Sequence, residues 1–156
     1  MAHPYTVRVI TRADLPALRK VVASTDLFPA HLLDGMAVDH LEGSNTDSLW
    51  LTVDGPEPIA VAYAAPEPMT EGTWNLYLIA VHADWHGRGV GQELLRFVEQ
   101  SLADQGQRLL LIETSGVPEF TRTREIYRRA GYQEEARLRD FYQAGEDKIV
   151  FTKRLN

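Results

Sequence analysis

The segment 73–102 constrains the fold more than any other part of the chain. Residues 73–82, TWNLYLIAVH, are apolar on both faces, as expected of a central strand covered on both sides. Residues 86–91, HGRGVG, then place a glycine at every second position. The apolar residues that follow are spaced as on a helix, and their stripe consists of Val90, Leu94, Phe97, Val98 and Leu102. The segment therefore predicts a buried strand, a glycine-rich turn and an amphipathic helix in direct succession.

The rest of the chain adds strands and helices to this unit. Strands are expected over residues 5–10, 48–54, 58–64, 108–114, 132–142 and 147–155. Helices are expected after Thr11, after Pro29 and from Pro118 to Ala130. The order β, α, α, β, β, β, α, β, α, β, β predicts a mixed α/β fold, with a central mixed sheet of about six or seven strands flanked by about four helices. We expect residues 1–156 to form a single domain.

Composition excludes several classes of function. The chain has 22 acidic against 16 basic residues and a formal charge of -6, which argues against a dedicated nucleic-acid-binding protein. There is no cysteine, so a disulfide framework and a catalytic thiol are excluded. The sequence shows neither a secretory signal nor the roughly 18 consecutive apolar residues of a membrane span. We therefore expect a cytoplasmic protein that binds neither nucleic acid nor membrane.

The glycine-rich turn at residues 86–91 differs from two known phosphate-binding loops. A P-loop requires Lys-Ser/Thr after its final glycine, whereas Gln92 and Glu93 follow Gly91. The dinucleotide pattern G-x-G-x-x-G requires a third glycine, and Gln92 or Leu94 stands at that place. What remains is a strand that leads through glycines into a helix N-terminus, where backbone amides bind anions. Arg88 adds a cation to this turn.

Two segments resemble one known family. HGRGVGQELL is similar to the acyl-CoA pyrophosphate loop of the GNAT family of N-acetyltransferases, whose core pattern is Gln/Arg-x-x-Gly-x-Gly/Ala. His86 stands where the family usually has Gln or Arg. Downstream, REIYRRAGYQEEARLRDFY resembles the family's Ala-x-x-x-Tyr-x-Lys-x-Gly-Phe segment, with Thr123 in place of the alanine. The residues that match in type are Tyr127, Arg129, Gly131 and Tyr132. An asparagine that the family carries upstream would fall at Phe120.

The resemblance implies the GNAT fold and acetyl-CoA as co-substrate. No metal is expected, because HADWH (82–86) lacks the glutamate of the H-E-x-x-H motif and the chain has no cysteine. The resemblance also implies that the strand before the loop separates from its neighbour, so that its unpaired backbone groups bind the pantetheine arm. On this chain, the residues expected to bind the cofactor in these two ways are Ile79, Ala80, Val81, Gly87, Arg88, Gly89, Val90, Gly91 and Gln92.

Acetyl transfer to an amine needs a base, because an alkylamine with a pKa near 10 arrives protonated at neutral pH. Glu113 is the first candidate, since it ends the apolar strand LLLIE and occupies a position that serves as base in some relatives of the family. Glu71, in the loop before the central strand, is the second candidate, and water alone stays open. Tyr127 is the candidate acid, because a phenol can protonate or hydrogen-bond the departing thiolate.

The acceptor is less defined by the sequence. We expect the helices at 12–42 and the final hairpin, with Asp140, Phe141 and Tyr142, to line its pocket. The acidic balance favours a cationic amine, which includes small molecules, amino acids and peptide N-termini. With no cysteine available for a covalent intermediate, direct attack in a ternary complex is expected.

Two other functions stay open. One is a catalytically silent acyl-CoA-binding sensor or regulatory module, and the other is a phosphate-binding module that does not take CoA. Whether the acyl group is strictly acetyl, and whether the chain forms a homodimer, also stays open.

Overall fold

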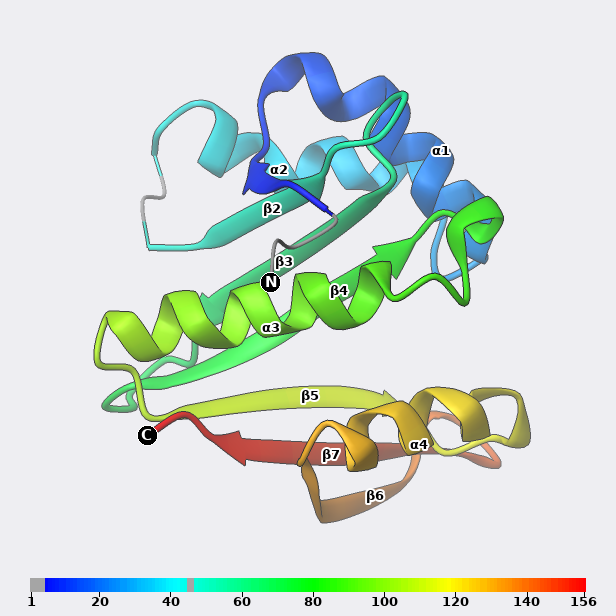
Figure 1. The fold of residues 1–156 in the computed structure, drawn as a ribbon. Helices are drawn as coiled ribbons and strands as arrows, with labels where there is room; N and C mark the ends of the chain where they lie inside the picture. The colour runs from blue at the N-terminus through cyan, green and yellow to red at the C-terminus, as the bar shows by residue number, and fades with distance from the viewer. Residues whose placement is uncertain (1–4, 45–46) are drawn as a thin grey trace. The chain divides into compact units, whose positions relative to one another are not determined.

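The computed structural model describes residues 5–44 and 47–156 of the chain. Its strands are β1 Val7–Val9, β2 Leu49–Val53, β3 Ala60–Pro66, β4 Thr73–Val81, β5 Leu109–Ser115, β6 Gln133–Gln143 and β7 Glu146–Arg154. Its α-helices are α1 Leu15–Thr25, α2 Leu33–Leu41, α3 Val90–Asp104 and α4 Thr121–Arg129 (Figure 1). The strands of the described residues form one sheet in the order β1-β2-β3-β4-β5-β7-β6. The predicted mixed α/β fold, with its numbers of strands and helices, is confirmed.

The chain divides into two compact units. The first comprises Met1–Ala65 and Tyr77–Ser101, and the second comprises Pro66–Leu76 and Leu102–Asn156. Strand β4 and helix α3 each contribute residues to both units. That residues 1–156 act as a single domain stays a prediction.

The first unit packs α1 and α2 against apolar side chains of its strands. Its core consists of Ile10, Leu18, Val21, Val22, Leu33, Ala37, Trp50, Val61, Leu78 and Ala80. The turn that precedes α1 is fixed by Asp14, whose carboxylate accepts the backbone N–H of Thr11 at 2.7 Å and both Nη atoms of Arg8 at 2.8 Å. Thr11 and Asp14 thereby form a capping box at the helix that was expected after Thr11.

In the second unit, β5 pairs with β4 in parallel and with β7 in antiparallel orientation. Ile112 lies opposite Phe151, and Glu113 lies opposite Val150. Because side chains alternate along a strand, these two pairs point to opposite faces of the sheet. The face with Phe151 is covered by α4, whose Tyr127 ring lies 5.8 Å from the Phe151 ring (Figure 1). Glu113 therefore lies on the face that α4 leaves open.

Strand β4 differs from the prediction at one residue. Its side chains at Trp74, Leu76, Leu78 and Ala80 are buried, as expected. On the alternate face, Asn75 is 1% exposed, and Thr73, Ile79 and Val81 are partly buried. Tyr77, which is 50% exposed, is the exception on that face. The strand is therefore covered on both sides except at Tyr77.

Candidate active site

The glycine-rich turn has a backbone that only glycine adopts readily. Gly87 has φ 76° and Gly89 has φ 81°, both in the left-handed region. A Cβ at either position would meet no heavy atom within 4 Å, so the constraint is the conformation and not the space. Helix α3 begins at Val90, and the carbonyl oxygen of Gly89 accepts the N–H of Glu93 at 3.1 Å. The amides before Glu93 thus belong to the first turn, where no intrahelical acceptor exists.

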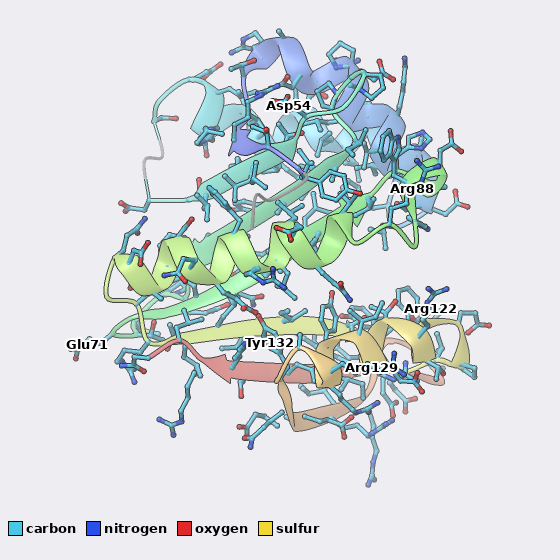
Figure 2. All side chains as sticks on the ribbon, viewed as in Figure 1. Asp54, Glu71, Arg88, Arg122, Arg129 and Tyr132 are labelled. Carbon is cyan, nitrogen blue, oxygen red and sulfur yellow. The ribbon has the colours of Figure 1, made fainter. Side chains whose placement is uncertain are left out.

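Three contacts hold this turn in place within the first unit. The ring Nε2 of His86 lies 2.7 Å from the carbonyl oxygen of Val81, and since a carbonyl only accepts, Nε2 carries the proton. The hydroxyl of Tyr5 donates to the carbonyl oxygen of Arg88 at 2.8 Å. The Arg88 guanidinium lies 4.8 Å above the Trp85 ring, and Figure 2 shows it in the turn that leads into α3. The histidine that departs from the family pattern therefore ties the turn to the end of β4.

The other expected cofactor residues lie where the sequence placed them. Ile79, Ala80 and Val81 end β4, and Gln92 lies in the first turn of α3. The carbonyl of Val81 is already engaged by His86, which the sequence did not indicate. That the backbone of these residues binds pantetheine stays a prediction.

The turn fits a pyrophosphate by its chemistry. It offers backbone N–H groups at the positive end of a 15-residue helix, two glycines without side chains and one guanidinium. The pyrophosphate would be held by the Arg88 guanidinium and by the backbone amides of residues 87–92, which include that of Gly91.

Glu113 has two partners on the open face of the second unit. Its Oε1 accepts a hydrogen bond from Asn75 Nδ2 at 3.0 Å, and its Oε2 forms an ion pair with Lys148 Nζ. The Glu113 side chain is 28% exposed and that of Lys148 is 14% exposed. Although Glu113 ends the apolar segment LLLIE, both of its carboxylate oxygens are held by polar groups.

The final hairpin surrounds Lys148 with aromatic residues. The Nζ of Lys148 lies 4.0 Å from the centre of the Phe141 ring, and the Phe141 and Tyr142 rings meet edge to face at 5.1 Å. Burial, with Glu113 and Glu146 as further causes, raises the pKa of Tyr142. A carboxylate, an ammonium and two aromatic rings thus occupy one region of the second unit.

Asp140, the third hairpin residue expected at the acceptor, has a structural task. It has φ 54°, and its Oδ1 accepts the backbone N–H of Gly145 at 2.8 Å. Its own N–H donates to Asp147 Oδ1 at 3.0 Å. These bonds shape the turn of the hairpin.

Tyr127 is buried among aromatic rings, with 7% of its surface exposed. Its ring lies 6.0 Å from that of Tyr132 and 5.8 Å from that of Phe151. Burial raises the pKa of Tyr127 to about 12. Since Tyr127 packs on the Phe151 face, it does not share a face with Glu113. A phenol of this kind is a hydrogen-bond donor at neutral pH.

Glu71, the second candidate base, lies in the loop that precedes β4, whereas the glycine-rich turn follows that strand (Figure 2). Its carbonyl oxygen accepts from Arg108 Nε at 2.7 Å, and the neighbouring Gly72 carbonyl accepts from the backbone of Arg108 at 2.7 Å. This part of the loop connects to the start of β5, four residues before Glu113.

The sequence pattern did not indicate that Asn75, Lys148 and Glu67 form one polar cluster with Glu113. Asn75 could have been noticed, because it is the only amide within the apolar run TWNLYLIAV. Nothing local distinguishes Lys148, because it reaches Glu113 through the pairing of β5 with β7.

Within residues 5–44 and 47–156, no group of three His, Cys, Asp or Glu side chains could hold a metal ion. No helix in this described part is long and apolar enough to cross a membrane.

Comparisons with known proteins agree with the fold. A family model described as an acetyltransferase (GNAT) domain matches residues 45–134. A crystal structure from Desulfovibrio desulfuricans, assigned to the same family of acetyltransferases, is 34% identical with a TM-score of 0.89, and the match covers 97% of this chain and 98% of that one. No curated protein matches the chain.

Two more distant structures share the fold. The ribosomal-protein-S18-alanine N-acetyltransferase of Escherichia coli is 20% identical with a TM-score of 0.79, covering 97% of this chain and 94% of that one. An aminoglycoside 6'-N-acetyltransferase complexed with coenzyme A is 17% identical with a TM-score of 0.77, covering 97% of each chain.

The fold and these matches define an N-acetyltransferase that takes acetyl-CoA as its co-substrate. More particularly, the chain belongs to the GNAT family.

Proposed function

We propose that this enzyme transfers the acetyl group of acetyl-CoA to a primary amine of a small molecule, an amino acid or a peptide N-terminus, by direct attack in a ternary complex. The observation that carries the proposal is the Glu113 carboxylate, fixed on the open face of its unit by Asn75 and Lys148. The proposal includes a cytoplasmic location. A homodimer stays open.

Glu113 is the proposed base. It takes a proton from the ammonium form of the acceptor, and the freed lone pair attacks the acetyl carbonyl carbon. The bond between that carbon and sulfur breaks, the electron pair leaves with the sulfur, and the second proton that the nitrogen must lose passes to the thiolate. To act in this way, Glu113 must share Oε2 between Lys148 and the acceptor, because Lys148 already pairs with this oxygen.

Tyr127 is the proposed hydrogen-bond donor to the departing sulfur. Nitrogen and sulfur are different atoms of the reacting group, so the base and the donor need not touch one another. The cofactor itself is held by the amides of residues 87–92 and by Arg88, while Ile79, Ala80 and Val81 offer backbone groups to the pantetheine arm.

The acceptor panel follows from the relatives. One of them is named for the alanine of a ribosomal protein, one for the 6' amine of aminoglycosides, and one for phosphinothricin. A peptide with an N-terminal alanine, an aminoglycoside and phosphinothricin therefore represent peptides, polycationic small molecules and amino acids.

The test measures binding and turnover separately. Glu113→Gln should bind acetyl-CoA as the wild type does, and lower thiol release with the best amine of the panel by about 100-fold or more, since general bases contribute ~10²–10⁴-fold. The matched control is Glu119→Gln, an exposed glutamate of the same unit, which should leave turnover unchanged. Equal turnover of the Glu113 variant and the wild type would show that Glu113 is not the base.

Two outcomes would favour the other functions. If acetyl-CoA stabilises the protein against heat and no amine gives thiol release above hydrolysis, the chain is an acyl-CoA sensor. If acetyl-CoA gives no stabilisation well above the expected Kd, the turn binds another phosphate.

A further inference from the structure

Asn75 is a buried amide in the middle of an apolar strand. It is 1% exposed, and its neighbours Trp74 and Leu76 are apolar and buried on the other face. Its Nδ2 donates to Glu67 Oε1 at 2.8 Å and to Glu113 Oε1 at 3.0 Å. One amide nitrogen thus joins two carboxylates within the second unit.

The orientation of this amide is determined by its partners. Both neighbours are carboxylate oxygens, which accept hydrogen bonds when ionised, so the NH₂ group must face them and the Oδ1 must face away. In the described part of the chain, Oδ1 of Asn75 is a buried oxygen without a hydrogen-bond partner. Buried polar atoms are nearly always satisfied, which makes such an oxygen an indicator of a missing donor.

The donor that the reaction brings to Glu113 is a nitrogen. An ammonium carries three N–H groups, of which Glu113 needs only one. We propose that Asn75 is a positioning residue for acetyl transfer: its NH₂ group holds Glu113 in place while its Oδ1 accepts a second N–H of the acceptor amine. The inference rests on the proposed function and names a primary amine as the group that this oxygen recognises.

The amide therefore has two separable tasks. Its donor side stabilises the charged form of Glu113, so its loss should move the acid limb of the pH profile of kcat/KM to higher pH. Its acceptor side binds the amine, so its loss should raise the KM for the amine and leave the binding of acetyl-CoA unchanged.

Two substitutions and a control distinguish these tasks. Asn75→Leu removes both sides and should lower kcat/KM for the amine by about 10- to 100-fold, the usual effect of losing a hydrogen bond to a charged group. Asn75→Asp keeps an outward oxygen and sets a second oxygen against Glu113, so its acid limb should lie at higher pH than that of the leucine variant. Above the acid limb, kcat/KM of the aspartate variant should return toward the wild-type value, whereas that of the leucine variant should stay low. Thr73→Val, on the same strand and face, should change neither quantity.

Thiol release is measured against pH, and acetyl-CoA binding is measured by calorimetry. The substrate is whichever amine of the panel (alanyl peptide, aminoglycoside or phosphinothricin) the wild type acetylates. Melting curves check the fold, and the aspartate variant carries the test if the leucine variant does not fold. Wild-type kcat/KM and an unmoved acid limb in both Asn75 variants would overturn the inference and leave the proposed function intact. If the wild type acetylates none of the three amines, the proposed function and this inference both fail.

Discussion

Replacing Tyr127 by phenylalanine removes one hydroxyl and keeps the ring. The ring packs between Tyr132 and Phe151, and phenylalanine preserves both contacts. The melting temperature should therefore change little, and any loss of activity reports on the hydroxyl.

The structure sets the size of the expected effect. Burial raises the pKa of Tyr127 to about 12, whereas a free thiol has a pKa of about 8.5, so complete proton transfer to the thiolate would be uphill by roughly 5 kcal/mol. A hydrogen bond to the charged sulfur is worth about 1.5–3 kcal/mol without any transfer. We therefore expect Tyr127→Phe to lower kcat by about 10- to 100-fold, and the basic limb of the pH profile to remain unchanged.

The assay is thiol release from acetyl-CoA between pH 6 and pH 10, with amine at saturation, for the wild type and the variant. A basic limb that is present in the wild type and absent in the variant would refute the argument, because Tyr127 would then titrate within that range. A kcat equal to that of the wild type would show that the hydroxyl does not reach the sulfur.

Two further changes test the cofactor turn and the fold. Gly89→Ala places a side chain at φ 81°, which should cost about 1–2 kcal/mol and weaken acetyl-CoA binding by calorimetry. The control is Gly91→Ala, whose Cβ would lie at an ordinary 3.5 Å from Val81, and it should match the wild type in melting temperature. If the Gly89 variant has the same acetyl-CoA affinity and stability as the wild type, the turn is not the cofactor site. Asp14→Asn weakens the bonds from Arg8, which are the largest cause of the lowered pKa of Asp14, and should cost about 1.5–3 kcal/mol at pH 7 by denaturant unfolding. Because a lowered carboxyl pKa stabilises the fold above the unfolded value of 3.8, the difference should shrink as the pH falls below 3.8 and through the folded pKa. A difference that stays constant as the pH is lowered from 7 through this range would contradict this explanation.

Local sequence predicted the glycine-rich turn and the elements on either side of it well. The alternation of glycines at 87, 89 and 91 and the start of an apolar stripe at Val90 locate a strand, a turn and a helix within a few residues. Both positive φ angles occur at these glycines, since backbone preference is a property of single residues. The anchoring of the turn by His86 and Tyr5 could not be predicted, because each contact depends on where a distant backbone carbonyl lies.

The catalytic side was predicted only in part. Glu113 stands out as a charge at the end of LLLIE, and its place on β5 is as expected. Its partners could not be foreseen, because Lys148 approaches through the antiparallel pairing with β7 and Asn75 through the parallel pairing with β4. The same pairing sends Tyr127 and Glu113 to opposite faces, which a linear motif cannot express.

The sequence by itself determined the elements, their order and the family of this protein. Those properties follow from spacing, since hydrophobic period, glycine placement and capping residues act over a few neighbours along the chain. The tertiary structure decided which polar groups meet. Register and strand order set those contacts, and they brought Asn75, Glu113 and Lys148 together from three strands to form a cluster that no segment of the chain contains.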